Sequence, residues 1–128
     1  CLAMRCYREG YDKTAIIRRA TSGSRILRQY ECLTYESYGL SGSNRFTHEV
    51  PTDGADTVII QQGINDIIHP VGESVNVFRP MSDLPTVEQL IEGLKTDIAK
   101  ARSFGYKGYV GTLLPMGEDM LKNAELKL

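Results

Sequence analysis

The sequence predicts an α/β fold with a parallel sheet, and three observations lead to this prediction. Two short apolar runs, at 55–61 and 107–115, lack the alternation of a half-exposed strand, which is typical of parallel strands buried on both faces. Between them, residues 86–105 carry apolar side chains at helical spacing. Turn-forming residues separate these segments, and alternation of strand and helix indicates parallel strands joined by right-handed crossovers.

The N-terminal part predicts three elements. Residues 2–9 favour a short helix, which we expect to end at Gly10. The β-branched centre of 13–21 predicts a first strand, and Ser-Gly-Ser then turns the chain. Residues 25–32 place their apolar side chains on one helical face, so we expect a helix there.

The middle of the chain predicts a short helix, a strand and a long loop. Ser43 or Asn44 is a suitable N-cap for the helix, because both side chains can accept from a first-turn N–H. The apolar run 55–61 follows as a central strand. Residues 67–85 contain three prolines and are expected to form a loop, and a connection of that length is usually functional or mobile.

The helix at 86–105 is the clearest element. Thr86 is expected to cap its N-terminus, Gly105 to end it, and Gly93 to lower its stability. The expected apolar face comprises Leu90, Ile91, Leu94, Ile98 and Ala101. A strand at 107–115 follows, and the last residues, 117–128, favour a loop or the start of a helix.

Length and composition limit the classes of function. The 128 residues suggest one domain, and the net charge of −1 gives no electrostatic reason to expect nucleic acid or an anionic membrane surface as a partner. No apolar run is long enough to span a bilayer, and no signal peptide is visible. Three irregularly spaced cysteines favour free thiols in a reducing compartment such as the cytoplasm. We expect no metal and no cofactor.

Two strand ends carry residues suited to catalysis. Ligands of open parallel sheets bind beyond the carboxyl ends of the strands. This rule selects the turn around Gly23, the stretch 61–66 after the second strand, and Thr112 and Pro115 after the third. Gly23 offers a backbone N–H, and Asn65 offers a neutral side-chain amide. Two neutral donors on adjacent loops make an oxyanion hole possible. Asn65 and Asp66 can also be read as a turn pair, and Gly23 as a plain turn glycine.

Four stretches resemble the SGNH hydrolases, also called the GDSL-like lipase/acylhydrolase family. "VIIQQGINDI" resembles the family block with G-x-N-D, and "ATSGSRIL" resembles the preceding block with its glycine. "SNRFTHEV" is similar to the stretch that leads into the G-x-N-D block, and "GYKGYVGTLLP" to the strand after it. The resemblance covers about residues 13–115. It implies a flavodoxin-like three-layer α/β/α fold and a serine esterase.

The resemblance also implies roles for single residues. Gly23 and Asn65 would supply two of the three oxyanion-hole donors, the third being the N–H of the nucleophile. Asp66 would be structural and hold its loop by hydrogen bonds, while Gly63 would let the loop turn. A small-molecule or carbohydrate ester, with a carbohydrate acetyl ester favoured, is the substrate class that the family suggests.

The sequence also departs from the family pattern at two blocks. The 128 residues contain neither the G-D-S-L block with the nucleophile nor the family's last D-x-x-H block with the base. The sequence therefore resembles the middle of such an enzyme, an incomplete fold that we expect to be inactive alone. The absent strand would lie between those at 13–21 and 55–61, so we expect a second fragment or chain to complete the sheet.

Several other side chains are candidates for a catalytic role. Asp66 and His69 have D-x-x-H spacing, but one short run is not expected to supply both the oxyanion loop and the base, so a substrate-rim role for His69 is favoured over a catalytic one. Ser22 and Ser24 lack a nucleophile motif. The arginines are expected to form a solvated basic face, namely Arg18, Arg19, Arg25 and Arg28. The alternative function is a non-catalytic α/β binding or interaction domain.

Overall fold

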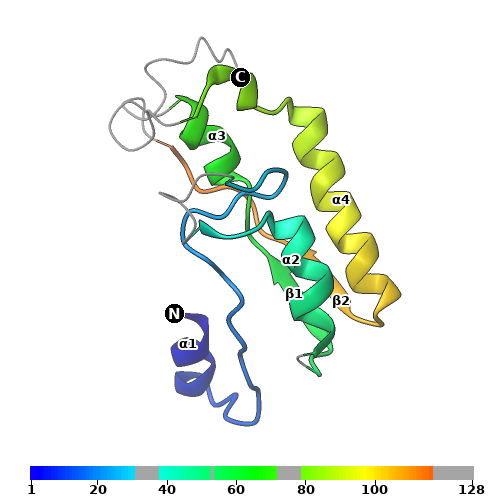
Figure 1. Cartoon of the computed structure of the whole chain (residues 1–128). Helices are drawn as coiled ribbons and strands as arrows, with labels where there is room; N and C mark the ends of the chain where they lie inside the picture. Colours follow the sequence, from blue (N-terminus) through cyan, green and yellow to red (C-terminus); the bar gives the residue numbers. More distant parts are fainter. Residues whose placement is uncertain (31–37, 53, 72–78, 117–128) are drawn as a thin grey trace.

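The computed structural model describes residues 1–30, 38–52, 54–71 and 79–116 (Figure 1). They form a small α/β fold, as the sequence predicts. In chain order the helices and strands are α1 (Leu2–Arg8), α2 (Gly42–Glu49), β1 (Thr57–Ile60), α3 (Ile64–Val71), α4 (Val87–Ser103) and β2 (Lys107–Val110). Two 3₁₀ turns, η2 (Val50–Thr52) and η3 (Met81–Asp83), lie between them. The expected C-terminal element at 117–128 lies outside the described residues.

The two strands form a parallel pair. Thr57 faces Lys107 and Ile60 faces Val110, so the predicted parallel pairing is confirmed. The chain between the strands contains α3 and α4, as a crossover requires (Figure 1). The core is built from a residue of α2, one of β1 and one of α4, namely Phe46, Ile60 and Ala101.

Among the described residues, helices cover only one face of this sheet. Side chains alternate along a strand, and those of Val58 and Ile60 point toward α2 and α4. On the other face Ile59 and Tyr109 are register partners, and each is 59% exposed. The prediction that both strands are buried on both faces is therefore wrong, because α2 and α4 both pack against the same side.

The predicted strand at 13–21 is not formed. Residues 14–21 form neither a strand nor a helix, and residues 11–20 are exposed. A strand needs a neighbour to accept and donate its backbone hydrogen bonds, and no described strand lies beside this segment. The predicted helix at its N-terminal side is confirmed as α1, with Gly10 at a φ of 82° after its end, and it stands apart from the body (Figure 1).

Helix α3 replaces the first part of the predicted long loop. Ile64, Ile68 and Val71 recur at helical spacing, and the last two are buried. The prolines of residues 67–85, Pro70 among them, indicate a loop from the sequence. Pro70 lies in the last turn of this short helix and has no N–H to donate to the carbonyl of Asp66, so α3 forms without that one backbone bond. Residues 72–78 of the predicted loop lie outside the described residues.

Helix α4 confirms the clearest prediction. Thr86 is its N-cap: the hydroxyl accepts from the N–H of Gln89 at 3.2 Å, and the Gln89 side chain accepts from the N–H of Thr86 at 2.9 Å. This reciprocal capping box satisfies two backbone donors that the helix itself leaves unpaired. Ala101 is fully buried and Leu94 and Ile98 pack on the core, whereas Ile91 is exposed and does not belong to the packed face.

Replacing Thr86 by alanine should lower the free energy of unfolding by about 1 kcal/mol, because the N–H of Gln89 loses its acceptor. Urea unfolding followed by circular dichroism measures this difference. Thr96→Ala is the matched control, since it makes the same change on an exposed position inside α4. Equal unfolding midpoints for the two variants would show that the cap does not stabilise the helix.

Helix α2 begins earlier than predicted and is tied to α4. Its N-cap is Ser41, whose hydroxyl accepts from the N–H of Asn44, so the choice of Ser43 or Asn44 is wrong. Ser43 instead donates its hydroxyl to Asp97 at 3.1 Å. Lys100 lies 3.5 Å from the same carboxylate and also donates to the carbonyl of Ser43 at 2.7 Å. Burial raises the pKa of Asp97 above its ordinary value, against the opposing effects of Ser43 and Lys100.

This pKa shift fixes the sign of a pH effect. Because the folded-state pKa of Asp97 is raised, its contribution to stability is complete below the unfolded value of 3.8 and is lost as the pH rises through the folded value. Asp97→Asn removes that loss. As the pH rises from 3.8 toward neutrality, the variant should therefore gain stability relative to the wild type in urea unfolding. A difference that stays constant over this range would contradict the raised pKa.

Candidate functional site

The candidate site begins where β1 ends. Gly63 is buried, and its φ of 115° turns the chain from the strand into α3, a conformation that favours glycine. Asn65 and Asp66 therefore lie in the first turn of α3, at the carboxyl edge of the sheet. The loop of residues 21–27 meets them there, although it comes from a distant part of the sequence.

Asp66 binds the backbone of that loop. Its Oδ2 accepts from the N–H of Ile26 at 2.8 Å, and its Oδ1 accepts from the N–H of Leu27 at 3.0 Å. Asp66 is buried, which raises the pKa of its carboxyl group above the ordinary value, although the two N–H groups and Arg25 act in the opposite direction. Both oxygens of the carboxylate thus hold the loop against α3.

Asn65 joins the same loop one residue after Gly23. Its side-chain Nδ2 donates to the carbonyl oxygen of Ser24 at 3.0 Å. An amide NH₂ group has two hydrogens, so one such bond leaves a second donor on the same nitrogen. The structure therefore brings the Gly23 turn and the Asn65 side chain together.

Helix α2 holds the loop from its other side. The N–H of Gly42 donates to the carbonyl of Arg25 at 2.7 Å, and the N–H of Ser43 donates to that of Ile26 at 3.3 Å. These N–H groups belong to the first turn of α2 and have no partner within the helix. The predicted helix at 25–32 is wrong for its described residues, 25–30, because both carbonyls that would begin its ladder are already occupied by α2.

Arg45 fixes the chain on the N-terminal side of the loop. Its guanidinium donates to the hydroxyl of Ser24 at 3.3 Å and to the carbonyl of Arg19. Glu49, one turn later in α2, orients that guanidinium through two bonds of 3.0 Å. Ser24 is 3% exposed and faces a guanidinium, which cannot accept a proton, so this environment does not suit a nucleophile.

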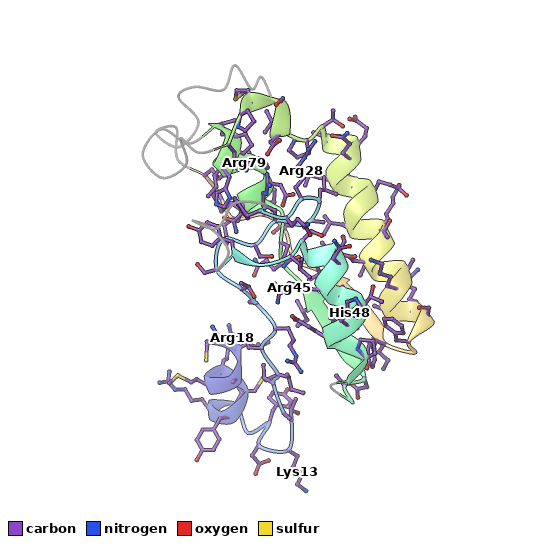
Figure 2. All side chains as sticks on the ribbon, viewed as in Figure 1. Lys13, Arg18, Arg28, Arg45, His48 and Arg79 are labelled. Atoms are coloured by element: carbon purple, nitrogen blue, oxygen red, sulfur yellow. The ribbon has the colours of Figure 1, made fainter. Side chains whose placement is uncertain are left out.

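A buried ion-pair cluster lies behind the loop. Arg25 is 1% exposed and donates to Asp83 at 3.1 Å, and Arg79 donates to the same carboxylate at 2.8 Å. Arg28 lies 3.6 Å from its other oxygen, and Figure 2 shows Arg28 and Arg79 at the end of the molecule that carries α3. The prediction of a solvated basic face is wrong for Arg25, because η3 brings Asp83 to it.

His69 lies inside this end of the molecule. It is in α3 and is 3% exposed, so the part of the loop on which a substrate-rim histidine was expected is a helix. Burial, followed by the charges of Arg25 and Arg79, lowers the pKa of His69 to about 4. A substrate would reach the imidazole only after the rings of Tyr30 and Tyr38 had moved, so this position lends no support to the rim role.

The described residues form neither a metal site nor a membrane-spanning helix. In these ranges no three side chains of the metal-binding types come together as a metal site requires. None of the helices in the same ranges combines the length and apolar character needed to cross a membrane.

Comparisons with known proteins identify no relative. The chain matches no protein-family model, and no match was found among curated proteins or solved structures.

Sequence reasoning missed four residues that build this site. Arg25 and Asp83 were not paired because 58 positions separate them. Arg45 carries a weak signal, since Glu49 four residues later is a favourable helical ion pair, but its bonds to the loop have no local signature. Tyr38 lies in a Gly/Ser-rich stretch, whose composition indicates a turn and gives no sign of an aromatic contact.

Proposed function

We propose that this chain is the central part of a serine ester hydrolase, in which Gly23 and Asn65 supply two of the three donors of an oxyanion hole. The observation that carries the proposal is the bond from the Asn65 amide to the carbonyl of Ser24. It places a side-chain donor beside the turn that holds the N–H of Gly23, at the edge of a parallel sheet where ligands bind. The resemblance to the SGNH hydrolases supports the same pair.

The chemistry of these two groups suits a developing negative charge. Both are neutral donors, so they can stabilise an oxyanion without the desolvation cost of a buried ion. Asn65 is half-buried, and one of its hydrogens is already bound to Ser24, which limits its rotation. Asp66 fixes the adjoining backbone through two further bonds. Such preorganisation is what an oxyanion hole requires.

The proposed reaction needs groups from outside these residues. A serine Oγ attacks the ester carbonyl, a base takes its proton, the alcohol leaves with a proton, and water then releases the acid from the acyl-serine. The sheet offers a place for the strand that carries the serine. Among the described residues β1 is paired only with β2, so its second edge can take another strand from a second fragment or chain.

A carbohydrate acetyl ester is the substrate class we favour. The test reads the coding DNA on both sides of these 128 codons and expresses the longest in-frame product. We expect an upstream G-D-S motif and a downstream D-x-x-H motif, and hydrolysis of p-nitrophenyl acetate and acetylated oligosaccharides by that product. Asn65→Ala should lower its kcat about 100-fold or more, the usual effect of losing one oxyanion-hole donor.

The matched control is Asn44→Ala, which removes the same side chain from an exposed position on α2. Its kcat should equal that of the unaltered product. The 128 residues alone should release no p-nitrophenol above the buffer rate. An unchanged kcat for Asn65→Ala, or an in-frame start and stop that enclose only these residues, would overturn the proposal and favour the non-catalytic binding domain.

A further inference from the structure

The ring of Tyr38 lies directly on Gly23. A Cβ atom built on Gly23 would stand 2.6 Å from Cγ and from Cε1 of Tyr38, which is closer than real side chains approach one another. The φ of Gly23 is 75°, a conformation that side chains other than glycine rarely adopt. The aromatic ring thus occupies the space beside the backbone whose N–H is the candidate donor.

Tyr38 belongs to an aromatic cluster with Tyr30 and His69. It stacks on the imidazole of His69, with ring centroids 5.7 Å apart and an angle of 26° between the planes. Tyr30 meets both rings edge to face, at 5.1 Å from Tyr38 and 5.5 Å from His69. Each ring of the cluster therefore contacts the other two, in the offset and edge-to-face geometries that aromatic pairs favour.

The cluster connects the two candidate donors. His69 follows Asn65 by four residues, so both side chains leave the same side of α3, one turn apart. Tyr38 therefore rests on the helix that carries one donor and covers the turn that carries the other. Asn65 and Asp66 hold the residues after Gly23, whereas Tyr38 contacts Gly23 itself.

Positive charges surround the cluster. The Arg25 guanidinium lies 4.6 Å from the ring centroid of Tyr30, and that of Arg79 lies 5.8 Å from it. Asp83 pairs with both arginines, and Asp66 is on the same helix as His69. A neutral imidazole is accommodated here. A protonated one would add a third positive charge in a buried place, in agreement with the lowered pKa of His69.

We propose that Tyr38 is a positioning residue that, stacked on neutral His69, fixes the Gly23 turn and so aims the N–H of Gly23 toward the space beside Asn65. The part of this inference that concerns binding of an oxyanion rests on the proposed function. The fixing of the turn itself needs no substrate. Protonation of His69 is expected to weaken the stack and to loosen Gly23.

The test measures the backbone of Gly23 by ¹⁵N NMR in the 128-residue chain. In the wild type the order parameter of the Gly23 N–H should be near 0.85, the value of a rigid backbone. Tyr38→Ala should lower it below about 0.6, and Tyr38→Phe should keep it at the wild-type value, because the ring and not the hydroxyl covers Gly23. The order parameter of the backbone N–H of Ile60 in β1 should stay unchanged in every variant, which shows that the fold is intact.

A pH titration adds a signature that a purely structural tyrosine would not give. The Gly23 amide shift should follow a transition near pH 4, the pKa of His69. Tyr38→Ala and His69→Phe should abolish the transition at Gly23, and the control His48→Gln, on an exposed histidine of α2, should retain it. If Tyr38→Ala unfolds, Tyr38→Leu replaces it, since leucine fills part of the space without a flat ring.

Two results would overturn the proposal: a rigid Gly23 in the Tyr38→Ala or Tyr38→Leu variant, or no transition at Gly23 when the imidazole of His69 titrates. The outcome is separable from that of the proposed function. Loss of order at Gly23 with no esterase activity in the longest in-frame product would leave the positioning role standing and remove the oxyanion role. A rigid Gly23 in the Tyr38 variants, together with esterase activity in that product, would remove the positioning role and leave the oxyanion role standing.

Discussion

Asp66→Ala should destabilise the protein by about 4 kcal/mol, because the buried N–H of Ile26 and the partly buried N–H of Leu27 lose their acceptors at about 1–3 kcal/mol each. Small domains are stable by only about 5–15 kcal/mol, so most of the folding free energy would be lost. Urea unfolding followed by circular dichroism measures the change.

Two further variants make this prediction specific. Asp66→Asn keeps one carbonyl oxygen and turns an NH₂ group toward the other donor, so it should lie between the wild type and Asp66→Ala. Asp12→Ala removes an exposed carboxylate and should change the free energy of unfolding by less than about 0.5 kcal/mol. Equal stability of Asp66→Ala and Asp12→Ala would mean that the carboxylate does not hold the loop.

Asp83→Ala should cost about 3–5 kcal/mol, since it leaves the buried guanidinium of Arg25 without its carboxylate. Arg28 and Arg79 lose the same partner, but both are more exposed and can be hydrated. The double variant Arg25→Met with Asp83→Leu should recover much of the loss, because it removes the unpaired buried charge. A double variant less stable than Asp83→Ala would contradict this account.

The stabilisation by Asp83 should also depend on pH. Burial alone would raise the pKa of Asp83, but the hydrogen bonds and charges of Arg25 and Arg79 outweigh it and hold the pKa below 3.8. A depressed pKa gives stability that is complete above the unfolded value and is lost as the pH falls through the folded one. Unfolding midpoints from pH 5 to pH 2 should show this loss in the wild type and not in Asp83→Asn.

The elements that the sequence predicted well are those whose causes are local. The capping box of α4 lies within four consecutive residues, and the apolar spacing that follows it is read directly from the chain. The strands at 57–60 and 107–110 are short apolar runs bounded by turns, and their pairing follows from the alternation of elements. The position of Asn65 at a strand end could be inferred for the same reason.

The elements that it predicted wrongly depend on distant partners. Residues 13–21 have a composition that favours a strand, but a strand is not formed without a neighbour. Residues 25–30 have helical spacing, yet their N–H and carbonyl groups are bound by Asp66 and by α2. The residues next to Arg25 in the sequence do not predict its contact with Asp83. Those next to Tyr38 do not predict its contact with His69.

The bonds that hold the Ser24–Leu27 loop also set the order in which the molecule can fold. Helix α4 is built from contacts three and four residues apart and can form early. The loop is closed by a contact from Ile26 to Asp66 across 40 positions and by one from Arg25 to Asp83 across 58. Closing such long segments of chain costs conformational entropy before the contacts can stabilise the fold. We therefore expect the turn at Gly23 to form in the last cooperative step, so that no partly folded intermediate contains it.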